Sequence, residues 1–331
     1  MSEPDNDSRL RHHDVRPTRE TASLAEDVRR GLLEPPRALP PKYFYDDEGS
    51  QLFEAICDTP EYYPTRTEDA LLAESAHAVI ARVAPDHIIE LGSGSSRKTR
   101  HLLAACDRQG IKTRYWPFEV STQIMLDSAR DLLATYPWLE VEAMTGDYTG
   151  GLANLPLAAD GGRRLFVFLG GTIGNFEPAA GEALLAEIRA LMNPGDALLL
   201  GMDRVKDPDV LEAAYDDAAG HTARFNRNVL TVLNRELGGD FPIAAYRHQS
   251  VFNAEASRIE MWLIATAAHR VSFKALDAGF EMTAGEGIRT EISRKFSPAS
   301  IQQLLDRAGL SAQDHFEAEG GAYSLVLAAE A

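Results

Sequence analysis

His87-Ile-Ile-Glu-Leu-Gly-Ser-Gly-Ser-Ser-Arg-Lys98 joins a short apolar run to a glycine turn, and a helical pattern follows it. Glu90 lies at the end of the run, and the turn contains Gly92 and Gly94. A strand, a glycine turn and a helix in this order bring bare backbone close to a ligand at a helix N-terminus. The segment therefore predicts either a nucleotide-type binding site or a tight turn that binds nothing.

The residue at position 97 narrows the choice of ligand. A dinucleotide fingerprint would place its third glycine there, and the chain has Arg97 instead. An acid two residues before the first glycine, without a third glycine, fits S-adenosylmethionine (SAM) better than NAD. We therefore expect Glu90, Gly92 and Gly94 to contact SAM.

Length, charge and cysteine content limit the classes of function. A chain of 331 residues has room for about two domains, or for one domain with a large insertion. The formal charge of −17 argues against binding to nucleic acid or to an anionic membrane. Two cysteines cannot form a disulfide framework, and no apolar run approaches the ~20 residues that span a bilayer. We expect a cytoplasmic protein that binds no metal and acts as a monomer.

Helical and strand patterns alternate through the central part of the chain. Strands are expected at 87–91, 113–120, 139–144, 164–169 and 197–202, with helices at 68–83, 96–108, 121–135 and 179–192. Alternation of this kind is typical of βαβ units. It predicts an α/β fold with a doubly wound, mostly parallel, Rossmann-like sheet.

The regular alternation of strands and helices stops on both sides of this central part. Residues 1–20 are polar and lack periodicity, which predicts a disordered tail. After residue 204 we expect two helices within 207–237, a hairpin of 247–252 with 258–265, and a strand at 269–273. Segments 21–66 and 205–295 are expected to form a second, α+β domain that binds the substrate. Segments 67–204 and 296–331 would form the domain that binds SAM.

Polar residues follow each expected strand of the parallel sheet. Glu119 ends the second strand, Asp147 and Tyr148 follow the third, and the glycine-rich run from Gly170 to Asn175 follows the fourth. Ligands of doubly wound sheets bind beyond the carboxyl ends of the strands. One carboxylate can accept hydrogen bonds from both hydroxyls of a ribose diol, and a second carboxylate can accept one from an adenine amino group. A single acid at such a place is often a helix cap, but the set favours a nucleoside site.

Several longer strings resemble the histidine-specific Nα-methyltransferases of ergothioneine biosynthesis. They are Leu39-Pro-Pro-Lys-Tyr-Phe-Tyr45-Asp, Thr59-Pro-Glu-Tyr62-Tyr-Pro-Thr-Arg-Thr-Glu68, Ile89-Glu-Leu-Gly-Ser-Gly94, Phe168-Leu-Gly-Gly-Thr-Ile-Gly-Asn175, Tyr215-Asp-Asp-Ala-Ala-Gly220, Phe225-Asn-Arg-Asn-Val-Leu230, Arg258-Ile-Glu-Met261-Trp and Thr290-Glu291-Ile-Ser293-Arg-Lys-Phe296. The match runs from about residue 21 to the C-terminus. It implies a class I methyltransferase core and three methyl transfers from SAM to the α-amine of L-histidine, giving hercynine and S-adenosylhomocysteine.

The resemblance also implies roles for individual residues. Gly92 and Lys98 would flank the methionine part of SAM, Glu119 would hold the ribose and Asp147 the adenine, with Tyr148 beside it. The acid of the second strand is usually Asp in this family; the longer Glu119 can still reach a ribose diol, and we expect this departure to change SAM affinity. The implied substrate ligands are Tyr62, Asn175 and Tyr215 for the carboxylate and amine; Tyr45, Glu291 and Ser293 for the imidazole; Met261 and Phe53 as apolar walls; and Gly170 and Thr222 as further lining.

No dedicated catalytic base is expected. A bound sulfonium is already an activated electrophile, so the chain has to align the amine and keep it neutral. Desolvation of the α-amine in a pocket lowers its pKa.

Three alternatives remain open from the sequence. The same fold could methylate tryptophan, tyrosine or another amino acid, although Glu291 favours an imidazole because a carboxylate accepts its N–H. Without the resemblance, Glu291 would be a solvated residue of an alternating strand. A nicotinamide oxidoreductase is disfavoured by Arg97, and a binding protein without catalysis is disfavoured by the complete set of pocket residues.

Overall fold

The structure is a computed structural model that describes residues 8–157 and 161–331. Its largest element is an eight-stranded sheet with the order β1-β5-β4-β3-β6-β7-β14-β13. The strands are β1 (Leu10–Asp14), β3 (His87–Leu91), β4 (Arg114–Glu119), β5 (Glu140–Thr145), β6 (Arg164–Phe168), β7 (Ala197–Asp203), β13 (Leu310–Glu317) and β14 (Tyr323–Glu330). The pairs from β1 to β7 are parallel, whereas β14 and β13 run antiparallel. The predicted α/β, mostly parallel sheet is confirmed.

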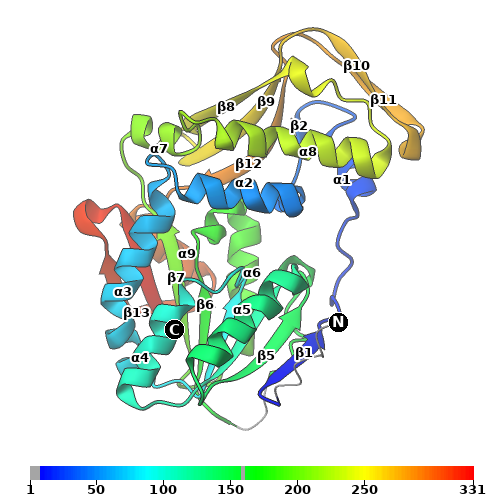
Figure 1. Ribbon diagram of the computed structural model, residues 1–331. Coiled ribbons are helices and arrows are strands. Elements are labelled where there is room, and N and C mark those ends of the chain that lie inside the picture. The colour runs from blue at the N-terminus through cyan, green and yellow to red at the C-terminus, as the bar shows by residue number, and fades with distance from the viewer. Residues whose placement is uncertain (1–7, 158–160) are drawn as a thin grey trace.

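Helices cover both faces of this sheet because its strands are apolar on both sides. The neighbouring residues Ile88 and Ile89 of β3 are fully buried in two different hydrophobic cores. One core contains residues of α3 (Tyr63–Val83), α4 (Thr99–Gln109) and α5 (Thr122–Thr135). The other contains residues of α6 (Pro178–Leu191) and α9 (Pro298–Arg307). The result is a three-layered α/β/α unit (Figure 1).

Chain direction across the sheet reverses at β3. From β3 the chain passes to β4 and β5 on one side, and then to β6 and β7 on the other. Ligands of doubly wound folds bind at such a switch point, beyond the carboxyl ends of the strands. The turn after β3 contains Gly92 and Gly94, so the fold brings the segment expected to bind SAM to this place.

The N-terminal segment corrects one prediction. Residues 8–20 are not a disordered tail: β1 pairs in parallel with β5, from Leu10 opposite Val141 to Asp14 opposite Thr145. The backbone N–H of Val15 donates to Thr145 O at 2.8 Å, and that of Thr18 donates to Gly150 O at 2.8 Å. The polar composition of this segment suggested disorder, but an edge strand can be polar because it is held by hydrogen bonds to its neighbour, here β5. Residues 1–7 of the expected tail lie outside the described part of the chain.

A second unit is built from the segments before α3 and after β7. Its sheet has the order β2-β12-β9-β8, and β10 pairs with β11 in a hairpin. The elements are α1 (Leu24–Gly31), β2 (Arg37–Ala38), η1 (Pro41–Phe44), α2 (Asp47–Cys57), α7 (Pro208–Ala214), α8 (His221–Leu237), β8 (Tyr246–Asn253), β9 (Arg258–Ala265), β10 (His269–Phe273), β11 (Ala278–Met282) and β12 (Gly287–Arg294). One hydrophobic core, from Val28 to Ile288, joins both segments. The two helices and the hairpin predicted after residue 204 are confirmed.

The second unit is attached at the carboxyl end of β7. Arg204 and Phe296 form a parallel bridge, and Phe296 N donates to Asp203 O at 2.8 Å. The chain therefore leaves the large sheet and returns to it at one point, with residues 205–295 in between. Figure 1 shows this unit above the large sheet, with α2 between the two. None of the helices in the described residues is both long and apolar enough to cross a membrane.

Candidate functional site

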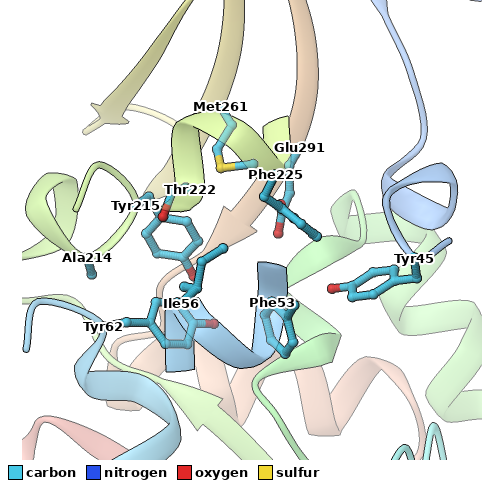
Figure 2. Close-up of a pocket in the computed structure, with 10 residues that line it drawn as sticks. All are labelled: Tyr45, Phe53, Ile56, Tyr62, Ala214, Tyr215, Thr222, Phe225, Met261 and Glu291. Atoms are coloured by element: carbon cyan, nitrogen blue, oxygen red, sulfur yellow. The ribbon is translucent and has the colours of Figure 1, made fainter. Parts of the chain in front are cut away.

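A pocket lies where α2, α7 and α8 meet strands β9 and β12 of the second unit (Figure 2). It is lined by Tyr45, Phe53, Ile56, Tyr62, Ala214, Tyr215, Thr222, Phe225, Met261 and Glu291. The structure thus brings together seven residues that the sequence assigned to the substrate. They come from both segments of the second unit, so the pocket exists only after those segments pack against each other.

Strand geometry brings Glu291 to this pocket. Glu291 of β12 pairs with Met261 of β9, and a β-bulge after Arg289 shifts the register just before it. Bulges re-aim the side chains that follow them. Glu291 and Ser293 are two residues apart, so their side chains leave the same face of β12. The Glu291 carboxylate points toward the middle of the pocket (Figure 2).

Aromatic rings form most of the pocket wall. The ring centroids of Tyr45 and Phe53 lie 5.7 Å apart, and those of Tyr62 and Tyr215 lie 5.9 Å apart, both edge to face. Phe225 lies 5.7 Å from the Tyr45 ring. Edge-to-face contacts of this kind fix ring orientation and add to the energy of burial. The wall is therefore rigid and mostly apolar, with hydroxyl groups at a few fixed points.

The tyrosine hydroxyls of the pocket are neutral at physiological pH. Burial raises the pKa of Tyr45, Tyr62 and Tyr215, and the nearby Glu291 carboxylate raises each of them further. The Tyr45 residue is 46% exposed, but its hydroxyl points into the pocket (Figure 2). Neutral phenols can donate to a carboxylate without reacting with a methyl donor.

The Glu291 carboxylate has no hydrogen bond to any other described residue, although its side chain is largely withdrawn from solvent. Burial raises the pKa of Glu291 to about 7, and the Lys295 ammonium opposes that rise. A carboxyl group with this pKa gains from a partner that donates a hydrogen bond to it. Glu291 is therefore suited to accept an N–H group from a ligand.

A buried polar network supports Tyr215 from behind. The Tyr215 hydroxyl donates to Ser293 Oγ at 2.8 Å, and Lys295 Nζ donates to Tyr215 Oη at 3.0 Å and to Ser293 Oγ at 2.9 Å. Lys295 Nζ also lies 2.8 Å from Asp203 Oδ2. Ser293, which the sequence placed against the imidazole, is thus beside the pocket and bonded to one of its lining residues.

The turn after β3 leaves room for a ligand. Gly92 and Gly94 have φ angles of +69° and +49°, a region that L side chains rarely adopt. A Cβ at Gly94 would meet no atom within 4 Å, and Ser93 Oγ is buried without a hydrogen-bond partner among the described residues. Open space beside bare backbone and an unpartnered hydroxyl fit a polar ligand at the switch point.

Acidic groups stand at the ends of the next two strands. Glu119 accepts from Gly94 N at 2.9 Å and from Val120 N at 2.8 Å, so its carboxylate spans from β4 to the glycine turn. Asp147 Oδ1 accepts from Thr149 N at 2.8 Å. The Tyr148 ring lies next to the turn, because a Cβ on Gly92 would lie 3.5 Å from Tyr148 Cε1. The structure brings these three residues, expected from the sequence, around one loop cluster.

Glu90 lies beneath this turn. It is buried, and it accepts a hydrogen bond from the Tyr115 hydroxyl, which also lies 2.8 Å from Ser96 Oγ. Burial raises the pKa of Glu90 to about 7. These contacts connect β3 and β4 to the glycine turn, so Glu90 supports the shape of the turn.

Lys98 and Gly170 are joined by a residue to which the sequence assigned no role. Glu68 of α3 is fully buried, forms an ion pair with Lys98 and accepts from Gly170 N at 2.9 Å. The Tyr323 hydroxyl donates to the same carboxylate at 2.8 Å. Glu68 therefore ties the loops after β3 and β6 to β14. Asn175, in the short helix η3 (Thr172–Asn175), is outside the pocket lining.

Several pocket residues were missed from the sequence. Ile56, Ala214 and Phe225 line the pocket, Lys295 holds its Tyr215 hydroxyl in place, and Glu68 holds the loops that contain Lys98 and Gly170. The apolar three fit the ordinary pattern of helix cores, and only their place in the assembled fold distinguishes them. Within the described residues, no three His, Cys, Asp or Glu side chains gather as a metal site would require.

Comparison with known proteins gives a family. The profile of a family described as histidine-specific, SAM-dependent methyltransferase matches residues 24–330. A histidine N-alpha-methyltransferase of Mycolicibacterium smegmatis is 45% identical over 92% of this chain and 94% of its own length. One of Mycobacterium tuberculosis is 44% identical over 93% and 95%. Ergothioneine biosynthesis protein 1 of Neurospora crassa is 28% identical over 89% of this chain and 33% of its own length. The chain belongs to the family of histidine-specific, SAM-dependent methyltransferases.

Proposed function

We propose that this enzyme transfers three methyl groups from SAM to the α-amine of L-histidine and so produces hercynine, a step of ergothioneine biosynthesis. The observation that carries the choice of histidine is Glu291, a largely buried carboxylate without a hydrogen bond to another described residue, which faces the pocket. An imidazole N–H satisfies such a group, whereas a phenyl ring or an aliphatic side chain leaves it unpaired.

The residues around the glycine turn fit SAM. When bound, SAM supplies a methyl group on a sulfonium, which needs no further activation. Gly92 and Gly94 leave backbone bare for its methionine part, Glu119 would accept from the ribose hydroxyls, and Asp147 would accept from the adenine amino group. The extra methylene of Glu119, relative to the Asp usual in this family, allows the carboxylate to reach Gly94 N as well. Tyr148 would pack beside the adenine.

The pocket would orient histidine with its α-amine toward the glycine turn. Tyr62, with Asn175, would hold the carboxylate, and Tyr215, whose own proton goes to Ser293, would accept from the amine. Glu291 and Ser293 would hold the imidazole, and Phe53 with Met261 would form its walls. Tyr45 lies between the substrate pocket and the glycine turn, because Glu291 of the pocket and Tyr148 beside the turn are both near enough to raise the pKa of its hydroxyl.

Alignment and desolvation would supply the catalysis. The α-amine must be neutral to attack, and an apolar aromatic pocket disfavours its charged form. No lining residue needs to act as a base if solvent takes three protons: one from the α-ammonium before the first transfer, and one from the ammonium that each of the first two transfers forms. We assign segments 21–66 and 205–295 to substrate binding, and segments 67–204 and 296–331 to SAM binding.

A panel of the twenty amino acids with labelled SAM tests this proposal. The expected result is transfer to histidine above all others, with the label on the α-amine. Transfer confined to tryptophan or tyrosine would contradict the choice of histidine as the substrate. Binding of NAD in place of SAM, measured by calorimetry, would contradict the class of reaction itself.

A further inference from the structure

Lys295 is a fully buried cation that the proposed reaction does not use directly. Its Nζ contacts three oxygens: Asp203 Oδ2 at 2.8 Å, Ser293 Oγ at 2.9 Å and Tyr215 Oη at 3.0 Å. Its side chain has no exposed area. Burial alone would lower the pKa of Lys295, but the Asp203 carboxylate outweighs burial and raises it above the ordinary range. The amine is therefore an ammonium with three donors and three acceptors.

The hydrogen bonds of this network determine which groups of Ser293 remain free. An ammonium can only donate, so Tyr215 and Ser293 accept from Lys295. Tyr215 then donates its own proton to Ser293 Oγ at 2.8 Å. The two lone pairs of Ser293 Oγ are both taken, by Lys295 and by Tyr215. Ser293 can only donate in turn, and no described residue accepts that proton.

Ser293 lies on the pocket side of β12, where its free proton can be directed to a ligand. Ser293 and Glu291 leave the same face of β12, and the Glu291 carboxylate points into the pocket (Figure 2). The two residues thus offer opposite groups to a ring between them: Glu291 accepts and Ser293 donates. A neutral imidazole has one N–H and one bare nitrogen, and it matches this pair.

We propose that Lys295 is a positioning residue that fixes Ser293 as a hydrogen-bond donor, so that the pocket selects a ring with one N–H and one bare nitrogen. This inference rests on the proposed function, and it adds that the site recognises the second ring nitrogen through a hydrogen bond donated by Ser293. An imidazolium carries N–H on both nitrogens and would leave one of them facing a hydroxyl without a lone pair. Pyrrole rings, which lack the bare nitrogen, leave the Ser293 proton without an acceptor.

A purely structural role for Lys295 is the competing explanation, because Asp203 needs a cation. Lys206 provides a matched control for that role. Lys206 Nζ lies 2.6 Å from Asp203 Oδ1 and is also largely buried, but it contacts neither Tyr215 nor Ser293. Removal of Lys206 takes a charge from the same carboxylate and leaves the three hydrogen bonds of Lys295 intact.

The test compares histidine with its pyrrolyl analogues. β-(Pyrrol-2-yl)alanine and β-(pyrrol-3-yl)alanine each keep one ring N–H and replace the other nitrogen by C–H. For the unaltered enzyme we expect kcat/KM for histidine to exceed that for the better analogue roughly three- to tenfold, the worth of one neutral hydrogen bond. In Ser293→Ala this ratio should fall to about one, and in Lys295→Met it should fall part of the way, because Ser293 is then free to turn its proton away from the ring. The double variant, Lys295→Met with Ser293→Ala, should show the same ratio as Ser293→Ala alone, because Lys295 acts through Ser293.

Other variants complete the design. Lys206→Met should keep the ratio, and Lys295→Arg, which retains the charge and the donors, should restore most of it. If Lys295→Met does not fold, Lys295→Gln removes the charge and one donor at similar volume, and SAM affinity measured by calorimetry verifies the folded state.

Three results would overturn the inference. They are an equal loss for histidine and analogues in Lys295→Met, a loss of the ratio in Lys206→Met, and a retained ratio in Ser293→Ala. If the unaltered enzyme does not methylate histidine at all, the proposed function fails instead, and the two failures are distinct.

Discussion

Replacement of Glu291 by Ala perturbs the selection of the side chain most directly. The carboxylate faces the pocket, has no hydrogen bond to another described residue, and has a pKa that burial raises to about 7. Its loss removes one charged hydrogen bond to the imidazole, worth ~1.5–3 kcal/mol. Since ~1.4 kcal/mol corresponds to a factor of ten, kcat/KM for histidine should fall roughly ten- to a hundredfold.

The assay is the initial rate of methyl transfer at several histidine concentrations, with SAM saturating. Two measurements separate side-chain recognition from damage to the fold. SAM affinity should be unchanged in Glu291→Ala, because Glu291 is in the second unit, away from the glycine turn. Glu255→Ala, an exposed acid in the turn between β8 and β9, should leave kcat/KM unchanged. An unchanged kcat/KM for histidine in a folded Glu291→Ala enzyme would refute the reasoning.

Three further predictions concern stability and SAM binding. Because burial raises the pKa of Glu291 to about 7, the native state keeps this proton at pH values where the unfolded chain has lost it, and the free energy of unfolding decreases as the pH rises from about 4.5 to 7. This decrease amounts to about 3 kcal/mol at most, and Glu291→Gln should abolish it in urea titrations at the two pH values. Gly151→Ala, at a φ of +96° where a Cβ would collide with the N-terminal segment, should lower both the melting temperature and SAM affinity. Gly110→Ala, at a φ of +68° and in open space, should lower the melting temperature alone. Glu68→Gln should destabilise the fold by ~3 kcal/mol and weaken SAM binding, whereas the exposed Glu74→Gln of the same helix should change neither; equal effects of the two would contradict the role of Glu68.

Periodicity in the sequence was enough to predict the large sheet. Strands buried on both faces read as apolar runs, and the helices between them read as amphipathic segments, so β3 to β7 and their helices were found near their true ends. Strand β1 was missed because its residues are polar and it depends on β5 for its hydrogen bonds. Partner-dependent strands of this kind carry little local signal.

The candidate site was predicted unevenly for a related reason. Residues such as Tyr62 and Glu291 could be named because they occur in long strings that resemble one family. Lys295 was missed because a lysine near the end of an alternating strand is typical of a solvated position. The burial of Lys295 depends on its ion pair with Asp203, which is distant in the sequence. The two residues come together because the Arg204–Phe296 bridge joins the end of β7 to the end of β12.

Mass spectrometry of histidine incubated with the enzyme and excess SAM tests the central claim most directly. The account predicts a product that has gained three methyl groups, with fragmentation placing all of them on the α-nitrogen and none on the imidazole. Methylation of the ring, or no gain in mass while another amino acid is methylated, would contradict the assignment of the pocket around Glu291.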